Sequence, residues 1–257
     1  GYEGLRVDIN EQSSAGGSFV FDLDSANNSD IGVPPSLNGA RAVIREHMTL
    51  GEVLAHADFV GGVDPAQTDQ AMVFTDGSYH NVFPLDAGPQ FRRWIDVADN
   101  SLADAGLLPV APGRGLCVRR SSGAGAVTVA LAGEVRSNAF RQRLSEGFNL
   151  IAGGYPVATS PSMRAMGVDN GFVGGLDPAS ADQIHIWRAD ATPGQSGYDS
   201  YFLVDAGAGA ALRHWSLIGD GSLAPSDNSL IFPGGRACFI KMDDRDHPGY
   251  RWGEPQP

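Results

Sequence analysis

The chain has 257 residues, 42% of them hydrophobic, and 30 acidic side chains against 18 basic ones give it a net charge of −12. This hydrophobic content is sufficient for a folded core and excludes a disordered protein. The negative charge argues against nucleic acid and anionic membranes as partners, since both attract positive surfaces. No apolar run approaches the roughly 18 residues of a membrane span.

The first 23 residues are predicted to form a hairpin. Residues 4–9 read GLRVDI and residues 18–23 read SFVFDL, and both runs are rich in the β-branched, aromatic and aliphatic residues that strands favour. The first run resembles the strand that closes each later part of the chain. The hairpin is therefore a candidate strand donor.

Residues 24–42 are predicted to form a polar loop, and acidic side chains that could bind a metal through oxygen cluster near its start. Asp22, Asp24 and Asp30 are the candidate ligands for calcium, which prefers carboxylate and amide oxygens. A second acidic loop spans residues 96–104. Neither loop follows the EF-hand pattern, and Asx-turns are the alternative interpretation. No other cofactor is expected.

A short helix is predicted over residues 49–54, where Thr49 and Glu52 have the spacing of a capping box. Residues 162–166 read SMRAM and keep a serine at the capping position. We expect a matching short helix there.

An internal repeat is the strongest feature of the sequence. Residues 59–70 read FVGGVDPAQTDQ and residues 172–183 read FVGGLDPASADQ. The match continues downstream as far as Cys117 and Cys238. Equivalent positions in two neighbouring units seldom lie within the roughly 7 Å that a disulfide requires, so two free thiols are expected, with a disulfide as the alternative.

The repeat sets the predicted domain organisation: an N-terminal hairpin (1–23), an N-terminal repeat (24–120), a C-terminal repeat (121–242) and a tail (243–257). Glycine and proline are abundant, and short strand-like runs alternate with turn signals. This pattern predicts an all-β fold of two β-sandwich or barrel-like units, each with one short helix. The strand-like runs are residues 18–23, 126–131, 183–187, 200–204, 212–218 and 237–241.

Catalytic motifs are missing from the sequence. It has no Gly-x-Ser-x-Gly elbow and no Cys–His signature, and its six histidines lack the spacing of a zinc site. We therefore expect a protein that is not an enzyme.

One part of the chain is similar to a known pattern. Residues 147–151 read GFNLI, and residues 112–119 read PGRGLCVR. With the aromatic strands between such runs, they resemble the β-repeat of a family of uncharacterised secreted proteins from Verrucomicrobia-type bacteria. The resemblance is clearest over about residues 110–242. It implies secretion and a β-rich fold, and it implies no catalytic residues.

The two ends of the repeat are out of phase. The polar residues 243–249 follow the closing strand of the C-terminal repeat and predict no partner strand, so that strand is expected to have an open edge. The N-terminal hairpin would supply the missing strand to the next copy, and head-to-tail repetition would give a filament or layer. Pairing of the hairpin with its own chain is the alternative. The residues of the predicted interface are Leu5, Val7, Ile9, Phe19, Val20, Phe21, Phe239 and Ile240.

The sequence thus predicts an extracellular or cell-surface structural subunit that binds copies of itself. A carbohydrate-binding or adhesive module is the alternative, with Trp187, Tyr198 and Tyr201 as candidate glycan-binding residues. Trp94 and Trp215 occur in both copies of the repeat and are assigned to the core. A virion coat or decoration subunit is a further alternative.

Overall fold

The computed structural model divides into two compact units. Ala42–Glu134 with Leu150–Ala152 make up the four-stranded unit, and Gly1–Arg41, Val135–Asn149 and Gly153–Pro257 make up the five-stranded unit. The structure describes residues 8–9, 21–22, 44, 46–55, 57–75, 78–129, 140–153, 156–188, 197–207, 209, 212–226, 232–243 and 251–254.

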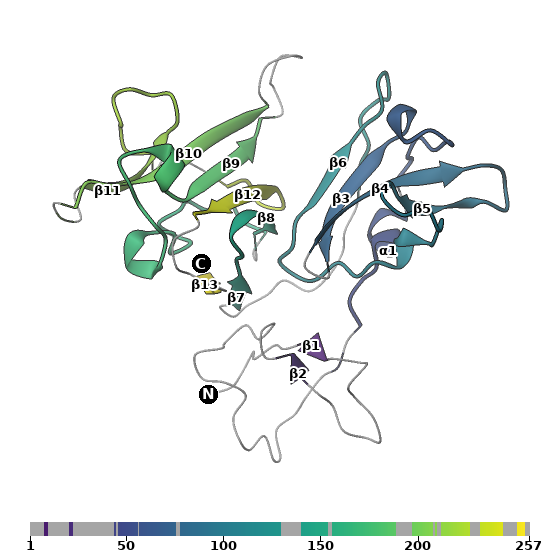
Figure 1. Cartoon of the computed structure of the whole chain (residues 1–257), viewed down its shortest axis with the longest axis horizontal. Helices are drawn as coiled ribbons and strands as arrows, with labels where there is room; N and C mark the ends of the chain where they lie inside the picture. Colours follow the sequence, from purple (N-terminus) through teal and green to yellow (C-terminus); the bar gives the residue numbers. More distant parts are fainter. Residues whose placement is uncertain are drawn as a thin grey trace. The chain divides into compact units, whose positions relative to one another are not determined.

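The four-stranded unit is built on an antiparallel sheet with the strand order β5-β4-β3-β6 (Figure 1). Two short helices precede the first of these strands, and a third lies between β5 and β6. The elements in chain order are α1 (Leu50–Leu54), η3 (Pro65–Gln67), β3 (Gln70–Thr75), β4 (Ser78–Asp86), β5 (Arg92–Asp96), η4 (Ala105–Leu107) and β6 (Leu116–Arg119).

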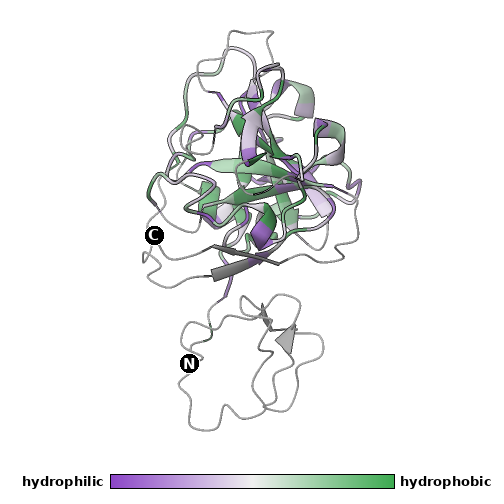
Figure 2. Ribbon diagram, turned by 90° about the vertical axis from the view of Figure 1, so that its left-hand side faces the viewer, coloured by the Kyte–Doolittle hydropathy of each residue, from purple (hydrophilic) through white to green (hydrophobic). Residues whose placement is uncertain are grey.

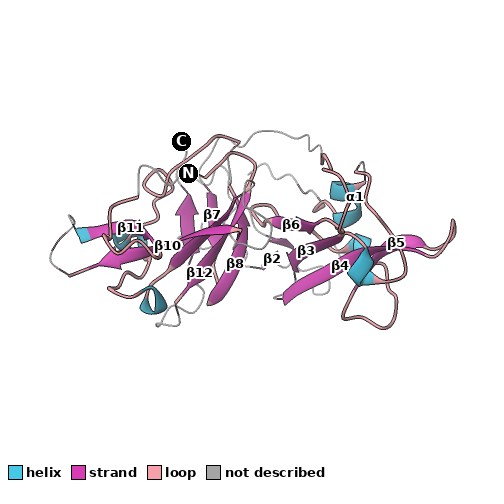
Figure 3. Ribbon diagram, turned by 90° about the horizontal axis from the view of Figure 1, so that it is seen from above, coloured by secondary structure: helices cyan, strands magenta, loops and turns pink. Residues whose placement is uncertain are grey.

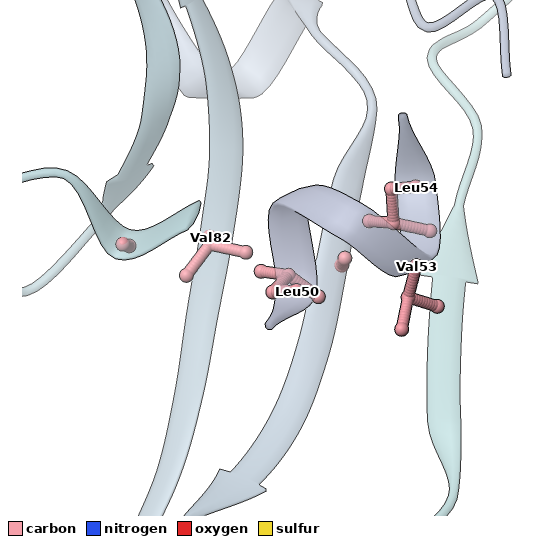
Figure 4. Close-up of a cluster of buried hydrophobic side chains, with 6 residues drawn as sticks. Leu50, Val53, Leu54 and Val82 are labelled. Atoms are coloured by element: carbon pink, nitrogen blue, oxygen red, sulfur yellow. The ribbon is translucent and has the colours of Figure 1, made fainter. Parts of the chain in front are cut away.

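Helix α1 begins where the capping box predicts. The Thr49 side chain accepts a hydrogen bond from the Glu52 N–H, and the Glu52 carboxylate accepts one from the Thr49 N–H at 2.8 Å. The Thr49 hydroxyl also donates to this carboxylate at 3.1 Å, and the two hydrogen bonds from Thr49, the backbone one first, lower the pKa of Glu52. The capped helix directs its apolar side chains at the sheet, and Figure 4 shows Leu50 facing Val82. The buried cluster consists of Leu50, Val53, Leu54, Ala71, Val82 and Ala105.

The five-stranded unit is built on a larger sheet with the order β11-β10-β9-β12-β8. Figure 2 shows that apolar residues, drawn in green, are concentrated on strands of the chain. The elements are β8 (Gly147–Ala152), η5 (Val168–Asn170), η6 (Pro178–Ser180), β9 (Gln183–Trp187), β10 (Tyr198–Asp205), β11 (Arg213–Leu217) and β12 (Ala237–Met242).

Two small antiparallel sheets complete the description. Strands β1 (Asp8–Ile9) and β2 (Phe21–Asp22) pair with each other, as a hairpin within residues 1–23 requires. Strand β13 (Arg251–Glu254) pairs with β7 (Phe140–Arg143). The C-terminal tail therefore contains a strand that the sequence did not predict.

The all-β class predicted from the sequence is confirmed. Figure 3 shows strands and loops throughout, and the helices of the described residues have only three to five residues each. The predicted strand at 183–187 is β9, and the runs at 200–204, 212–218 and 237–241 fall on β10, β11 and β12. Residues 126–129 are not a strand, so that prediction is wrong for them.

The second predicted short helix is also absent. Residues 161–165 form turns, in which the Met166 N–H donates to the Pro161 carbonyl at 2.9 Å. Helix α1 forms because Glu52 completes its capping box. The corresponding position after Ser162 is Ala165, which has no carboxylate to cap a helix. Ala165 also adopts a φ of 52°, which ends any helical turn.

The two large sheets share a topology. Strands that correspond in the sequence repeat, such as β3 and β9 or β5 and β11, take the same places in the two strand orders. This agreement supports the duplication, which stays a hypothesis drawn from the sequence.

One repeated residue, the aspartate before the first strand of each sheet, anchors the same two segments in both units. In the four-stranded unit Asp69 has no exposed surface. Its carboxylate accepts hydrogen bonds from the N–H groups of Val60 at 2.6 Å and Ser121 at 2.7 Å, and it pairs with Arg120. The carboxylate therefore ties the FVGG segment to the residues after β6.

Asp182 has the same role in the five-stranded unit. It is fully buried, and it accepts hydrogen bonds from the N–H groups of Val173 at 2.8 Å and Asp243 at 2.7 Å. The residues after β6 and β12 are thereby matched, Ser121 with Asp243.

This match shows that the two cysteines are not equivalent. The residue equivalent to Cys117 is Phe239, one position after Cys238. Cys117 lies opposite Met72, whereas Phe239 lies opposite His185, the counterpart of Met72. A slip of one residue turns a strand side chain to the other face, so Cys238 is buried and Cys117 is half-buried. Both are free thiols, as expected. Burial raises the pKa of Cys117.

Candidate functional site

Two of the three predicted glycan-binding residues lie side by side. Trp187 at the end of β9 and Tyr198 at the start of β10 are opposite each other in the antiparallel register. Their rings make an edge contact with centroids 5.1 Å apart. Trp187 remains 53% exposed, so a large apolar surface faces solvent.

Gly197 holds the Trp187 ring in place. It is buried, and a Cβ added to it would overlap three carbons of the indole. The ring therefore lies directly against the backbone at Gly197, just before β10, where only glycine leaves room. Packing of this kind fixes a ring before any ligand binds.

More aromatic rings continue from this pair across the sheet. The Tyr198 ring contacts Phe239 of β12 at 6.0 Å, and Phe239 contacts Phe148 of β8 at 6.1 Å. Phe148 also lies 5.4 Å from the ring of His185 and is 51% exposed. We call these five residues, Phe148, His185, Trp187, Tyr198 and Phe239, the aromatic strip.

The strip lies on one face because alternate strand residues point the same way. His185 and Trp187 are two residues apart on β9, and their partners across the strands are Phe239 and Tyr198. Ile184, the neighbour of His185 on the strand, is fully buried on the opposite face. At these positions the core thus lies on one face of the sheet and the aromatic strip on the other, whereas further along β10 Phe202 and Val204 are buried on the strip's face.

The third predicted residue, Tyr201, does not belong to the strip. It lies three residues after Tyr198 and pairs with Ile184 and Leu217. An odd spacing along a strand places it on the opposite face, so its assignment to the same site is wrong. Burial, with Asp199 as a secondary cause, raises its pKa.

Polar groups accompany the rings. His185 Nδ1 lies 2.7 Å from the Ser200 hydroxyl oxygen. Burial is the main cause that lowers the pKa of His185, and the charge of Lys241 adds to it. The imidazole is therefore favoured in its neutral form, which can both donate and accept a hydrogen bond.

The four-stranded unit has a much shorter aromatic group at the matching place. Phe74 and Tyr79 make an edge contact at 4.9 Å, and Arg114 lies over the Phe74 ring at 4.8 Å. Met72 and Cys117 stand where the strip has His185 and Phe239. The full strip is therefore specific to the five-stranded unit.

No family model matches the chain, and no curated protein or solved structure is significantly similar to it. The likeness to secreted β-repeat proteins stays an expectation from the sequence. No helix among the described residues is long and apolar enough to cross a membrane.

The predicted assembly edge is not where the sequence placed it. Strand β12, which carries Phe239 and Ile240, lies between β9 and β8 in the sheet. Strand β8 thus lies at the edge of β12 that was expected to be open, and the prediction of an open edge at β12 is wrong. Ile240 is fully buried, and Phe239 belongs to the aromatic strip.

The predicted hairpin residues are described only in part. Ile9 and Phe21 are register partners in the β1–β2 pair. The other four residues lie outside the described part of the chain: Leu5, Val7, Phe19 and Val20.

The calcium prediction falls mostly outside the described residues. Asp22 is described as part of β2 by its backbone alone, and Asp24 and Asp30 lie outside. Among the described residues there is no group of three or more His, Cys, Asp or Glu side chains that could hold a metal.

The second acidic loop forms turns, as the alternative interpretation proposed. Asp99 accepts hydrogen bonds from the Ser101 hydroxyl at 2.6 Å and its N–H at 2.8 Å, and these bonds lower the pKa of Asp99. Asp104 caps η4 by accepting from the Gly106 N–H at 2.8 Å. Asp220 accepts from the Ser222 N–H at 2.9 Å, as Asp99 does from Ser101.

Proposed function

We propose that the five-stranded unit binds carbohydrate through the aromatic strip. The observation that carries this proposal is the continuous run of rings from Trp187 to Phe148, whose two end members remain 53% and 51% exposed. Sugar rings present apolar C–H faces and polar hydroxyl edges. Exposed aromatic rings with polar neighbours complement both parts of such a ligand.

Single-stranded nucleic acid is the other ligand that stacks on such rings. Its binding requires a positive groove along the phosphates, whereas this chain has a net charge of −12. The charge therefore favours an uncharged glycan. A glycan-binding role agrees with the extracellular or cell-surface location that we expect from the sequence. We propose this location together with the glycan binding.

Screening the full chain on a glycan array, followed by titration calorimetry of the best ligand, tests the proposal. Trp187→Ala is expected to weaken binding about tenfold or more, since each tenfold step corresponds to about 1.4 kcal/mol and one aromatic contact contributes about that much. Gly197→Ala keeps the tryptophan but displaces its ring, so it should weaken binding in the same direction.

Phe91→Ala is the matched control. Phe91 is an exposed aromatic of the four-stranded unit, in the residue directly before β5, and it is distant in sequence from the strip residues. Its replacement should leave the affinity unchanged. Equal affinities of the full chain and Trp187→Ala, or an array without any bound glycan, would reject the proposal.

Self-assembly by strand donation is a second candidate. The observation that favours it is that β1 and β2 pair with each other and belong to neither large sheet. A two-stranded sheet is marginally stable by itself, so addition to a sheet edge of another copy would stabilise it. Strand β6 is the last described strand of its sheet and replaces β12 as the candidate acceptor.

Deleting residues 1–23 tests this second function. Light scattering after size-exclusion chromatography should show assemblies of the full chain and monomers of the shortened chain. A full chain that stays monomeric, or assemblies that persist after the deletion, would show that the hairpin does not join copies.

A further inference from the structure

A chain of hydrogen bonds joins a serine, a histidine and an aspartate in the four-stranded unit. The Ser78 hydroxyl oxygen lies 3.1 Å from His80 Nε2, and His80 Nδ1 lies 2.7 Å from Asp96 Oδ2. No sequence motif identifies this group, because its members come from two different strands.

The strands explain why these side chains meet. Ser78 and His80 are two residues apart on β4 and so point to the same face. Asp96 lies opposite Val82 on β5, one step along that face from His80, and such diagonal neighbours are within reach of long side chains. The Asp96 carboxylate is also held by the Ala98 N–H, which donates to Oδ1 at 2.9 Å.

The hydrogen bonds assign the protons. An ionised carboxylate only accepts hydrogen bonds, so His80 Nδ1 donates to Asp96. In the neutral imidazole Nε2 is then an acceptor, and it accepts from the Ser78 hydroxyl. This is the arrangement in which a histidine base activates a serine nucleophile and a carboxylate orients the histidine.

The histidine and the aspartate are more buried than the serine, as a substrate-accessible nucleophile with a protected base requires. The side chains of His80 and Asp96 are only 24% and 16% exposed, so their hydrogen bond is partly protected from water. Ser78 is exposed and open to a substrate.

The sheet itself does not require these residues. In the register of the five-stranded unit, Gly197 takes the place of Ser78, Asp199 that of His80 and Leu217 that of Asp96. None of the three reproduces the group, although the strand order is the same. The serine, histidine and aspartate are therefore specific to the four-stranded unit.

We propose that Ser78, His80 and Asp96 form an acyl-transfer site that hydrolyses small, activated carboxylic esters. Ser78 Oγ bonds to the ester carbonyl carbon and its proton passes to His80 Nε2. The bond to the leaving alcohol breaks, and the alcohol takes that proton. Water then gives a proton to His80 and attacks the acyl carbon, and the carboxylic acid leaves as Ser78 regains its proton. This site is independent of the aromatic strip and of the proposed carbohydrate binding.

Turnover of 4-nitrophenyl acetate by the full chain tests the proposal. Ser78→Ala and His80→Gln should each reduce multiple-turnover release of nitrophenolate about tenfold or more, since a positioned general base contributes about 10²–10⁴-fold. Asp96 is a positioning residue, so Asp96→Asn should lower kcat and leave KM nearly unchanged. Ser101→Ala is the matched control, because Ser101 is exposed and bonded to a carboxylate but no imidazole is bonded to it. It should leave the rate unchanged.

Labelling with a fluorophosphonate gives an independent readout. The Ser78 oxygen should displace fluoride and form a single phosphonyl adduct, which mass spectrometry locates on the peptide that contains Ser78. The circular dichroism spectrum and unfolding midpoint of each variant show whether it folds. Equal turnover by Ser78→Ala and the full chain, or equal labelling of Ser78 in His80→Gln, would overturn the proposal and leave the group as a structural hydrogen-bond chain.

Discussion

Replacing Asp69 by alanine is expected to destabilise the four-stranded unit by about 3–5 kcal/mol, the usual loss when one member of a buried ion pair is removed. The carboxylate has no exposed surface, and it binds the Val60 N–H, the Ser121 N–H and the Arg120 guanidinium. Alanine would leave all three donors without this acceptor. Unpaired buried donors retain the full cost of their lost hydration.

Urea unfolding, followed by hydrogen exchange of peptides from residues 42–134, measures this loss in the correct unit. A signal from the whole chain would mix two units, which need not unfold together. Asp69→Asn should lie between the parent and Asp69→Ala, because it keeps one acceptor oxygen. Asp99→Ala is the control: it removes a half-buried turn aspartate outside the buried network and should cost far less. A loss below about 1 kcal/mol for Asp69→Ala would mean that the buried network contributes little.

The repeated aspartates show which part of the structure can be predicted from the sequence and which cannot. The identical Asp-Gln pairs before β3 and β9 point to a structural role, since a duplicated framework retains what it needs. Their burial is invisible in the sequence, because an aspartate is normally exposed. Its hydrogen-bond partners Val60 and Ser121 come from both sides of the strand and meet only in the fold.

The slip at β6 and β12 shows a second limit. The sequence aligns Cys117 with Cys238 because both follow a Pro-Gly pair. The hydrogen bonds of Asp69 and Asp182 show that one extra residue precedes β12. A single residue is a small change in an alignment, yet it exchanges the two faces of a strand.

The candidate sites divide in the same way. Trp187 and Tyr198 are predictable from the part of the chain that differs between the repeats. Tyr201 lies on the other face of the sheet, because a spacing of three along a strand changes face. Phe148 and Phe239 joined the strip only once β8 and β12 were seen to be neighbours. Ser78 and His80 have a spacing of two, which places them on one face, but Asp96 required the register of β5.

Two tryptophans of the five-stranded unit, Trp215 and Trp187, should differ strongly in how much stability the same substitution costs. Trp215→Ala is expected to cost about 3–5 kcal/mol, as large-to-small changes at fully buried aromatics do. Trp215 has no exposed surface, and its ring meets the edge of Phe172 at 6.0 Å. Its indole N–H also donates to the Met166 carbonyl at 2.6 Å, so alanine would leave both a cavity and a carbonyl without this donor.

Trp187→Ala should change stability by about 0.5 kcal/mol or less, as for most surface positions, because the ring is 53% exposed. Urea unfolding of both variants, with the far-ultraviolet circular dichroism as signal, measures the pair. Trp215→Phe should fall between them, since it fills most of the volume but lacks the indole N–H that binds Met166. If Trp187→Ala instead proved as destabilising as Trp215→Ala, the aromatic strip would be part of the core. Loss of glycan binding in that variant would then report unfolding, so stability and affinity must be measured on the same protein.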